Sequence, residues 1–91
     1  MTYLQNLLEA QEMYMGVLQK LLGYTNKLKE IYDYYNEHHT WYENGIDLRR
    51  PLIGLQWSIS DYEGYKERYK ERLDTASDLY EKYGNVEMPE K

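Results

Sequence analysis

The chain of 91 residues contains no cysteine, no phenylalanine and only two prolines. Without cysteine it can form neither a disulfide framework nor a thiolate metal site, and it has no cysteine nucleophile. The absence of cysteine also gives no sign of an oxidising compartment. We therefore expect a cytoplasmic protein, located in the host cytoplasm if a virus encodes it.

Long hydrophobic runs are also missing. No apolar segment approaches the roughly 18 residues of a membrane-spanning helix, and the N-terminus lacks the basic and then apolar layout of a signal peptide. We expect no membrane partner. A chain this short forms one small domain that buries a modest share of its surface, so marginal stability or help from a second chain is expected.

Positive charge is scarce, with 11 Lys and Arg against 16 Asp and Glu, for a net charge of -5. A general nucleic-acid binder needs a cationic surface that displaces counterions from phosphates, so this balance argues against one and permits basic partners. What is abundant is tyrosine, with twelve residues, beside two tryptophans. These rings combine a large apolar area with a polar atom, and they suit surfaces that are partly core and partly interface.

Apolar residues recur at heptad spacing in the first half of the chain and predict one helix over about residues 2–43. Asn44 and Gly45 end it, because Gly45 suits a left-handed helix terminus. A break at Gly23 remains open as an alternative and would give a three-helix bundle. The two predicted rows are Leu4, Gln11, Leu18, Thr25, Tyr32 and His39, and Leu7, Tyr14, Leu21, Leu28, Tyr35 and Tyr42.

The same spacing resumes at Pro51 and predicts a second helix over about residues 51–83, closed by Gly84. Pro51 suits the first turn, where its missing N–H would be unpaired anyway. A competing start lies at Ser58 or Ser60, because Ser60 forms a capping-box pattern with Glu63. The two rows of this helix are Leu52, Ile59, Lys66, Leu73 and Tyr80, and Leu55, Tyr62, Tyr69, Ala76 and Tyr83.

Two such helices joined by a short connection predict an all-α antiparallel helical hairpin. We expect one domain over residues 1–84 and a flexible C-terminal tail over residues 85–91. In the expected register Tyr62 lies opposite Tyr32. Mixed charges between the rows of the second helix indicate a solvated face.

The first third of the chain has an apolar arc wider than one partner helix can cover. Residues 1–24 carry only Glu9, Glu12 and Lys20 as charged side chains. Because exposing this surface would favour aggregation, we expect two hairpins to self-associate into a homodimeric four-helix bundle. The expected self-association residues are Leu4, Leu8, Met13, Met15, Val17 and Leu22.

The segment IYDYYNEHHTWYENG, residues 31–45, gathers seven rings. Four of them belong to the two heptad rows and are expected to hold the hairpin shut near its bend. The others share a different helix face, and Trp and Tyr are enriched at interface hot spots. The alternative is that they pack on loop residues or in a homodimer contact. The expected partner-binding residues are Tyr34, His38, Trp41, Arg49 and Arg50.

No metal, cofactor or catalytic site is predicted. Adjacent helical residues point about 100° apart, so His38 and His39 cannot easily bind one ion. His39 and Glu43 are suitably spaced but would supply only two ligands. The chain has no glycine-rich phosphate loop and no nucleophile elbow, so we expect no enzyme.

The layout resembles that of small WxG-type helical hairpins exported by type VII secretion systems. That family has a Trp and a Gly at the bend and a Tyr-x-x-x-Asp/Glu signal after the second helix. Tyr83 and Glu87 of YGNVE match the signal, whereas WYENG places three residues between Trp41 and Gly45 where the family has one. The resemblance implies a protein exported by, or partnered with, such a system. In type, the chain also resembles small acidic helical inhibitors encoded by phages and viruses.

From the residues we expect a non-enzymatic protein–protein interaction module. It would be a small acidic helical adaptor or inhibitor, of the kind that phages and viruses encode, and would bind a larger protein. The type VII hairpin is the first alternative. A hairpin that binds nucleic acid directly, with Arg49 and Arg50 beside Trp41 and Tyr42, is the second.

Overall fold

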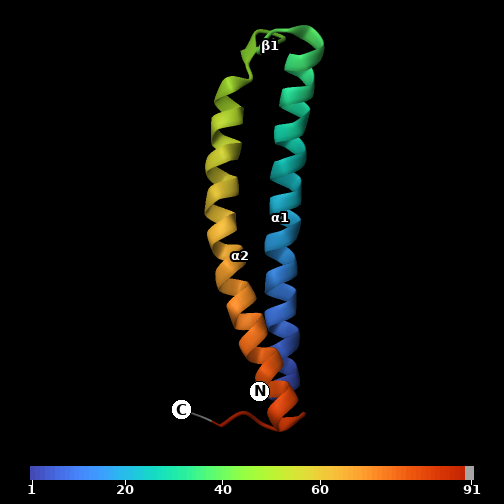
Figure 1. Cartoon of the computed structure of the whole chain (residues 1–91), viewed down its shortest axis with the longest axis vertical. Helices are drawn as coiled ribbons and strands as arrows, with labels where there is room; N and C mark the ends of the chain where they lie inside the picture. The colour runs from blue at the N-terminus through green and yellow to red at the C-terminus, as the bar shows by residue number, and fades with distance from the viewer. Residues whose placement is uncertain (90–91) are drawn as a thin grey trace. The chain divides into compact units, whose positions relative to one another are not determined.

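The computed structural model describes residues 1–89 and is an all-α antiparallel helical hairpin, as predicted. Its elements are α1 (Tyr3–His38), β1 (Tyr42–Glu43), β2 (Ile46–Asp47) and α2 (Arg49–Tyr83), as Figure 1 shows in chain order. The helix that crosses Gly23 is continuous, so the three-helix alternative is wrong.

The chain divides into two compact units, and each contains a segment of both helices. Unit 1 consists of Met1–Leu18 and Gly64–Lys91, and unit 2 consists of Gln19–Glu63. Within each unit a segment of α1 runs antiparallel to a segment of α2. The two units are described one at a time below.

In unit 1, α1 begins with a capping box. The hydroxyl of Thr2 accepts a hydrogen bond from the N–H of Gln5 at 3.1 Å, and the Gln5 side-chain oxygen accepts one from the N–H of Thr2 at 2.8 Å. The carbonyl of Thr2 accepts the first helical bond, from the N–H of Asn6. Two backbone donors that a helix end would otherwise leave unpaired are thereby satisfied.

The core of unit 1 is built from small side chains and stacked rings. Ala10 of α1 and Ala76 of α2 are each 1% exposed, and the ring of Tyr3 stacks on that of Tyr83 with centroids 5.0 Å apart. Both pairs fit one antiparallel register, because seven residues forward on α1 match seven residues back on α2. Val17, the next residue of this α1 row, is also buried.

This core corrects one of the two rows predicted for the first helix. The buried row passes through Tyr3, Ala10 and Val17, one residue before the predicted row that starts at Leu4. Val17 was an expected self-association residue, and that expectation is wrong because its side chain is buried inside the chain's own core. The second predicted row, which starts at Leu7, is confirmed as far as Tyr35. Leu21 of this row is buried, and its other members up to Tyr35 are half-buried.

The C-terminal segment of unit 1 is paired with the N-terminus. The N–H of Tyr3 donates to the carbonyl of Val86 at 3.0 Å, and the N–H of Met88 donates to the carbonyl of Met1 at 2.9 Å. The terminal ammonium also lies 3.1 Å from the Glu87 carboxylate. Residues 86–88 of the expected flexible tail thus contact residues 1–3, and residues 90–91 lie outside the described residues.

In unit 2, α1 ends at His38, before the predicted position near residue 43. His39 takes a left-handed conformation, with φ 56°, and its N–H bonds to the Tyr35 carbonyl at 2.7 Å. This is the left-handed helix end that glycine usually provides. The same motif closes α2 in unit 1, where the N–H of Gly84, with φ 71°, bonds to the Tyr80 carbonyl, as predicted.

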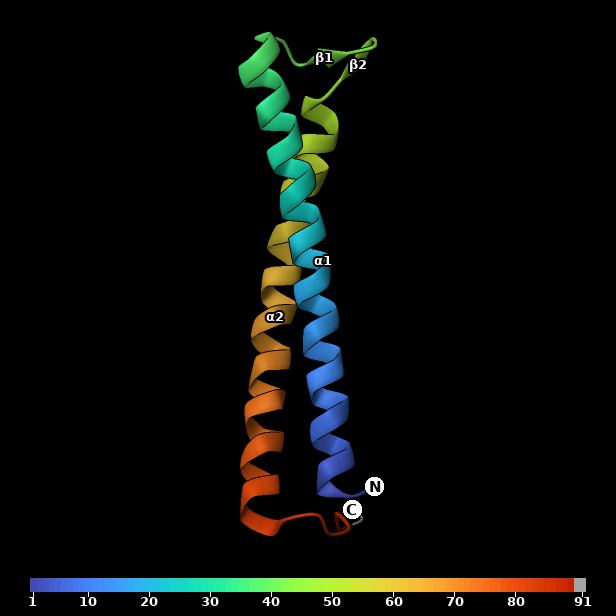
Figure 2. The same ribbon diagram turned by 90° about the vertical axis from the view of Figure 1, so that its right-hand side faces the viewer.

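Asn44 and Gly45 do not end the helix but form the tip of a β-hairpin. Their φ values are 52° and 81°, and positive φ at both central residues is the type I′ turn for which Asn-Gly is preferred. β1 and β2 pair antiparallel with Tyr42 opposite Asp47 (Figure 2). Asn-Gly is the strongest short-range hairpin signal, and the heptad pattern across it led us to interpret it as a helix terminus.

The core of unit 2 has a different register from the predicted one. Leu21 of α1 and Leu52 of α2 are buried, and Tyr62 meets Tyr24 edge-on with centroids 5.5 Å apart. The expected pairing of Tyr62 with Tyr32 is wrong because α1 stops earlier and α2 begins earlier than predicted. Both predicted rows of α2 are confirmed, and of their members only Tyr83 is exposed.

Candidate interaction surfaces

Trp41, an expected partner-binding residue, packs on its own chain. Its indole stacks on Tyr35 with centroids 4.1 Å apart and planes 14° from parallel, and it meets the edge of Tyr32 at 6.2 Å. The prediction that Trp41 shares a helix face with Tyr34 and His38 is wrong, because α1 ends before it reaches Trp41. The alternative expectation was packing on loop residues or in a homodimer contact, whereas the ring contacts these two tyrosines of α1.

Tyr34 and His38 do share a face of α1. Their rings lie 4.4 Å apart, and the Tyr34 hydroxyl donates a hydrogen bond to the carbonyl of Tyr42 at 2.9 Å. Tyr34 therefore ties the last turns of α1 to β1. Of the four rings expected to close the hairpin, Tyr35 is half-buried, while Tyr32, His39 and Tyr42 are exposed.

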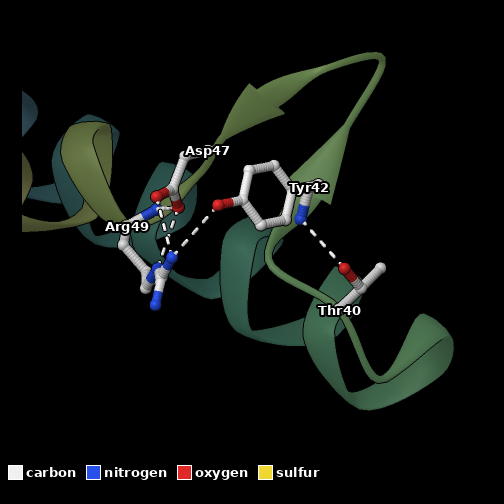
Figure 3. A network of polar contacts seen from close by, with 4 residues as sticks. All are labelled: Thr40, Tyr42, Asp47 and Arg49. Atoms are coloured by element: carbon white, nitrogen blue, oxygen red, sulfur yellow. Dashed lines mark hydrogen bonds and ion pairs between the residues drawn. The ribbon is translucent and has the colours of Figure 1, made fainter.

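Arg49 is held by the β-hairpin through several polar contacts (Figure 3). Its Nε and Nη2 donate to the two oxygens of Asp47 at 3.0 and 2.9 Å, and its backbone N–H donates to the same carboxylate at 3.0 Å. The guanidinium lies 5.9 Å from the centre of the Tyr42 ring. The N–H of Tyr42 in turn donates to the Thr40 hydroxyl at 3.2 Å.

The contacts between Asp47 and Arg49 stabilise the start of α2. The Asp47 carboxylate supplies an acceptor for an N–H in the first turn of α2, which would otherwise lack a partner in the helix. Hydrogen bonds from Arg49 hold the pKa of Asp47 below its usual range, and the same bonds raise the pKa of Arg49. Arg49 thus anchors the start of α2, whereas Arg50 is exposed.

An exposed apolar patch on α2 was missed by the sequence reasoning. Trp57 is 70% exposed and Ile53, one turn before it, is also exposed. A shallow depression lined by Gln56, Trp57 and Ser60 lies beside the indole. The available signal was that Trp57 and Ile53 fall outside both heptad rows of this helix. We call Arg50, Ile53 and Trp57, which follow one another at helical spacing, the Trp57 patch.

The expected self-association residues divide by burial. In unit 1, Leu8 is 54% and Met15 is 53% exposed, whereas Leu4 and Met13 are half-buried. The Met13 sulfur accepts a hydrogen bond from Arg72 of α2 at 2.7 Å, so this side chain contributes to the hairpin itself. In unit 2, Leu22 is exposed.

Within residues 1–89, no three His, Asp or Glu side chains gather in a way that could hold a metal ion. None of the described helices combines the length and the apolar character needed to cross a membrane. Comparison of the chain with protein-family models, with curated proteins and with solved structures finds no match.

Proposed function

We propose that the protein is a non-enzymatic interaction module, an adaptor or inhibitor acting in the cytoplasm, that binds a larger protein through the Trp57 patch. One observation carries this proposal: among the large apolar side chains of residues 1–89, Trp57 has the highest exposed fraction, 70%. A tryptophan side chain offers more apolar area for burial than most residues, and tryptophan is enriched among the residues that dominate binding energy.

The surroundings of Trp57 suit a docking site. Gly54 lies beside it on the helix, and a methyl group placed on Gly54 would meet open space, so the approach to the indole is unobstructed on that side. Gln56 and Ser60 border the depression and offer hydrogen-bonding groups around an apolar centre. Arg50 adds an exposed guanidinium two turns away, which can bind a carboxylate of the partner.

Capture of a partner from source-cell lysate tests the proposal. Immobilised wild-type protein should retain a specific larger protein, and Trp57→Ala and Ile53→Ala should lose it. Leu22→Ala is the matched control, because Leu22 is an apolar residue of unit 2 on the other helix whose exposed fraction, 62%, lies between those of Ile53 and Trp57. Equal capture by the wild type and Trp57→Ala would contradict the proposed site.

Fluorescence provides a direct readout of the same site. Trp41→Phe leaves Trp57 as the single tryptophan and keeps an aromatic ring on Tyr35. Free protein should show the long-wavelength emission and strong iodide quenching of an exposed indole. Addition of the captured partner should shift the emission to shorter wavelength and reduce quenching, whereas an unchanged spectrum would place the contact elsewhere.

A second candidate is a WxG-like hairpin that is exported by, or partnered with, a type VII system. The hairpin architecture favours it, with Trp41 in the connection between the helices. Coexpression of the tagged chain with such a system should deliver it to the medium, and Tyr83→Ala should abolish this. Glu81→Ala, a change at a nearby exposed position outside the signal, is the control. Retention of the wild type inside the cells would count against export.

A further inference from the structure

In unit 1, α1 presents more apolar rows than its own hairpin uses. Two rows are buried or half-buried in the core, and they begin at Tyr3 and Leu7. Two further rows of α1, one with Leu4, Gln11 and Leu18 and one with Leu8 and Met15, lie about 100° further round the helix. We call these the outer seam, which consists of Leu4, Leu8, Gln11, Met15 and Leu18.

The outer seam has the spacing of a coiled-coil contact. Its members alternate by three and four residues, which is the pattern by which one helix packs its side chains into another. Leu8 and Met15 are each more than half exposed, and Leu4 and Leu18 are half-buried. An apolar surface of this kind is usually covered in a stable protein.

α2 does not share this property in unit 1. Its exposed positions there are dominated by charged side chains of both signs, and its exposed large apolar side chains are two tyrosines, Tyr65 and Tyr83. The uncovered aliphatic surface of this helical pair is therefore on α1. A partner is therefore expected to contact α1. The exposed charged residues of this α2 segment are Glu67, Arg68, Lys70, Glu71, Asp74, Asp78, Glu81 and Lys82.

The charges around the outer seam favour an identical partner. Residues 1–18 contain only Glu9 and Glu12 as charged side chains, and Glu9 lies 3.4 Å from Arg72 of its own chain. A partner selected by charge would find little to recognise, whereas two copies of this seam can approach with little like-charge repulsion. Self-pairing of this kind is the rule in symmetric dimers.

Gln11 is the polar residue in the middle of the outer seam. Its amide has both donor and acceptor groups, so an identical amide on a second copy can satisfy it when both are removed from water. A single polar residue within an apolar seam also sets the register in which two helices pair. A purely apolar groove on a different protein would leave this amide without a partner, at a cost in affinity.

We propose that the outer seam packs against the outer seam of a second copy of this chain. The dimer then contains four helices, and each α1 contacts its own α2 through one pair of rows and the second α1 through the other pair. This contact is independent of the Trp57 patch, which lies in unit 2. The two surfaces can therefore be tested separately.

The oligomeric mass in solution tests the inference. Light scattering at micromolar concentration should give twice the chain mass of 11.1 kDa for the wild type. The double variant Leu8→Glu/Met15→Glu should give the mass of one chain with unchanged far-ultraviolet circular dichroism, because both side chains are exposed in the single chain. Thr75→Glu/Ser77→Glu, at exposed positions of α2, should remain dimeric and is the matched control.

A second substitution is nearly isosteric and lies at an exposed position, so it should leave the fold of the single chain unchanged. Gln11→Glu would bring two carboxylates close together in the seam, and at pH 7 it should raise the dimer dissociation constant at least tenfold. A wild type that is monomeric at micromolar concentration would overturn the inference. So would a dimer whose dissociation constant is unchanged by Gln11→Glu, which would show that copies associate through another surface.

Discussion

The indole of Trp41 lies flat against the ring of Tyr35, with centroids 4.1 Å apart and planes 14° from parallel. Trp41 directly precedes β1, and this contact packs it on the last turns of α1. The ring therefore stabilises the bend in unit 2. Trp57 of the same unit has the opposite environment, since most of its side chain is in contact with solvent. The two tryptophans should therefore differ in what they contribute to folding.

Replacement of Trp41 by alanine should lower the free energy of unfolding by about 2 kcal/mol, since it removes a half-buried ring and its stacking on Tyr35. Replacement of Trp57 by alanine should change it by less than about 0.5 kcal/mol, because the ring is exposed. Urea denaturation followed by circular dichroism measures both. Equal losses would show that Trp57 also supports the fold.

Replacement of His39 by glycine should raise the free energy of unfolding by about 1 kcal/mol, because a non-glycine residue is strained at positive φ. His39 has φ 56° and ends α1 with a backbone hydrogen bond that glycine can also make. The reciprocal variant is Gly84→Ala, which introduces the same strain at the end of α2 and should destabilise by a similar amount. Urea midpoints that move in the same direction for both variants would be inconsistent with this account.

The helix-interior glycines of α1 should be replaceable with a gain in stability. A methyl group added at Gly16 or Gly23 meets no heavy atom within 4 Å. Alanine has a helix propensity better than that of glycine by about 1 kcal/mol, so Gly16→Ala and Gly23→Ala should each raise the free energy of unfolding by about that amount. Thermal unfolding would report a higher midpoint for each variant, and a lower midpoint at either site would reveal a need for the glycine.

Asp47 should titrate below the ordinary aspartate pKa of 3.8, because hydrogen bonds from Arg49 favour its charged form. A group whose pKa is depressed by folding stabilises the fold above its unfolded pKa, and this contribution disappears as the pH falls through the folded pKa. Carbon NMR of the Asp47 carboxyl should show the low midpoint, and Arg49→Gln should raise it.

Stability measurements provide the second half of that test. The wild type should be more stable than Asp47→Asn at pH 7, and the difference should vanish once the pH lies below the folded pKa of Asp47. Asp33→Asn is a suitable control, since Asp33 is an exposed aspartate of the same unit. A difference that persists in strong acid would assign the effect to something other than the carboxylate charge.

The second helix was predictable because its pattern allows one solution. In residues 61–83, apolar side chains fill most of two adjacent rows and charges dominate the remaining positions, so only one face of that segment can be buried. Its end was predictable as well, since Gly84 follows the last turn and can adopt positive φ. Local chemistry and long-range packing favour the same structure at these positions.

The bend was harder because two local signals compete there. The heptad pattern continues from Tyr35 to Tyr42 and favours helix, whereas Asn44-Gly45 favours a tight hairpin. The helix ends next to His39, which adopts the left-handed conformation that glycine usually provides, and no glycine marks this end in the sequence. The expected arrangement of Tyr34, His38 and Trp41 on one face failed for this reason, since it required the helix to continue.

By itself the sequence determined that the chain forms two long amphipathic helices in an antiparallel hairpin, and which face of α2 is buried. It did not determine which face of α1 is buried, because apolar rows lie on both sides of the row that begins at Leu7. The tertiary structure selected the row of Tyr3, Ala10 and Val17, in the register that stacks Tyr3 on Tyr83. A heptad pattern identifies apolar faces, but only the fit between two helices decides which face a neighbour occupies.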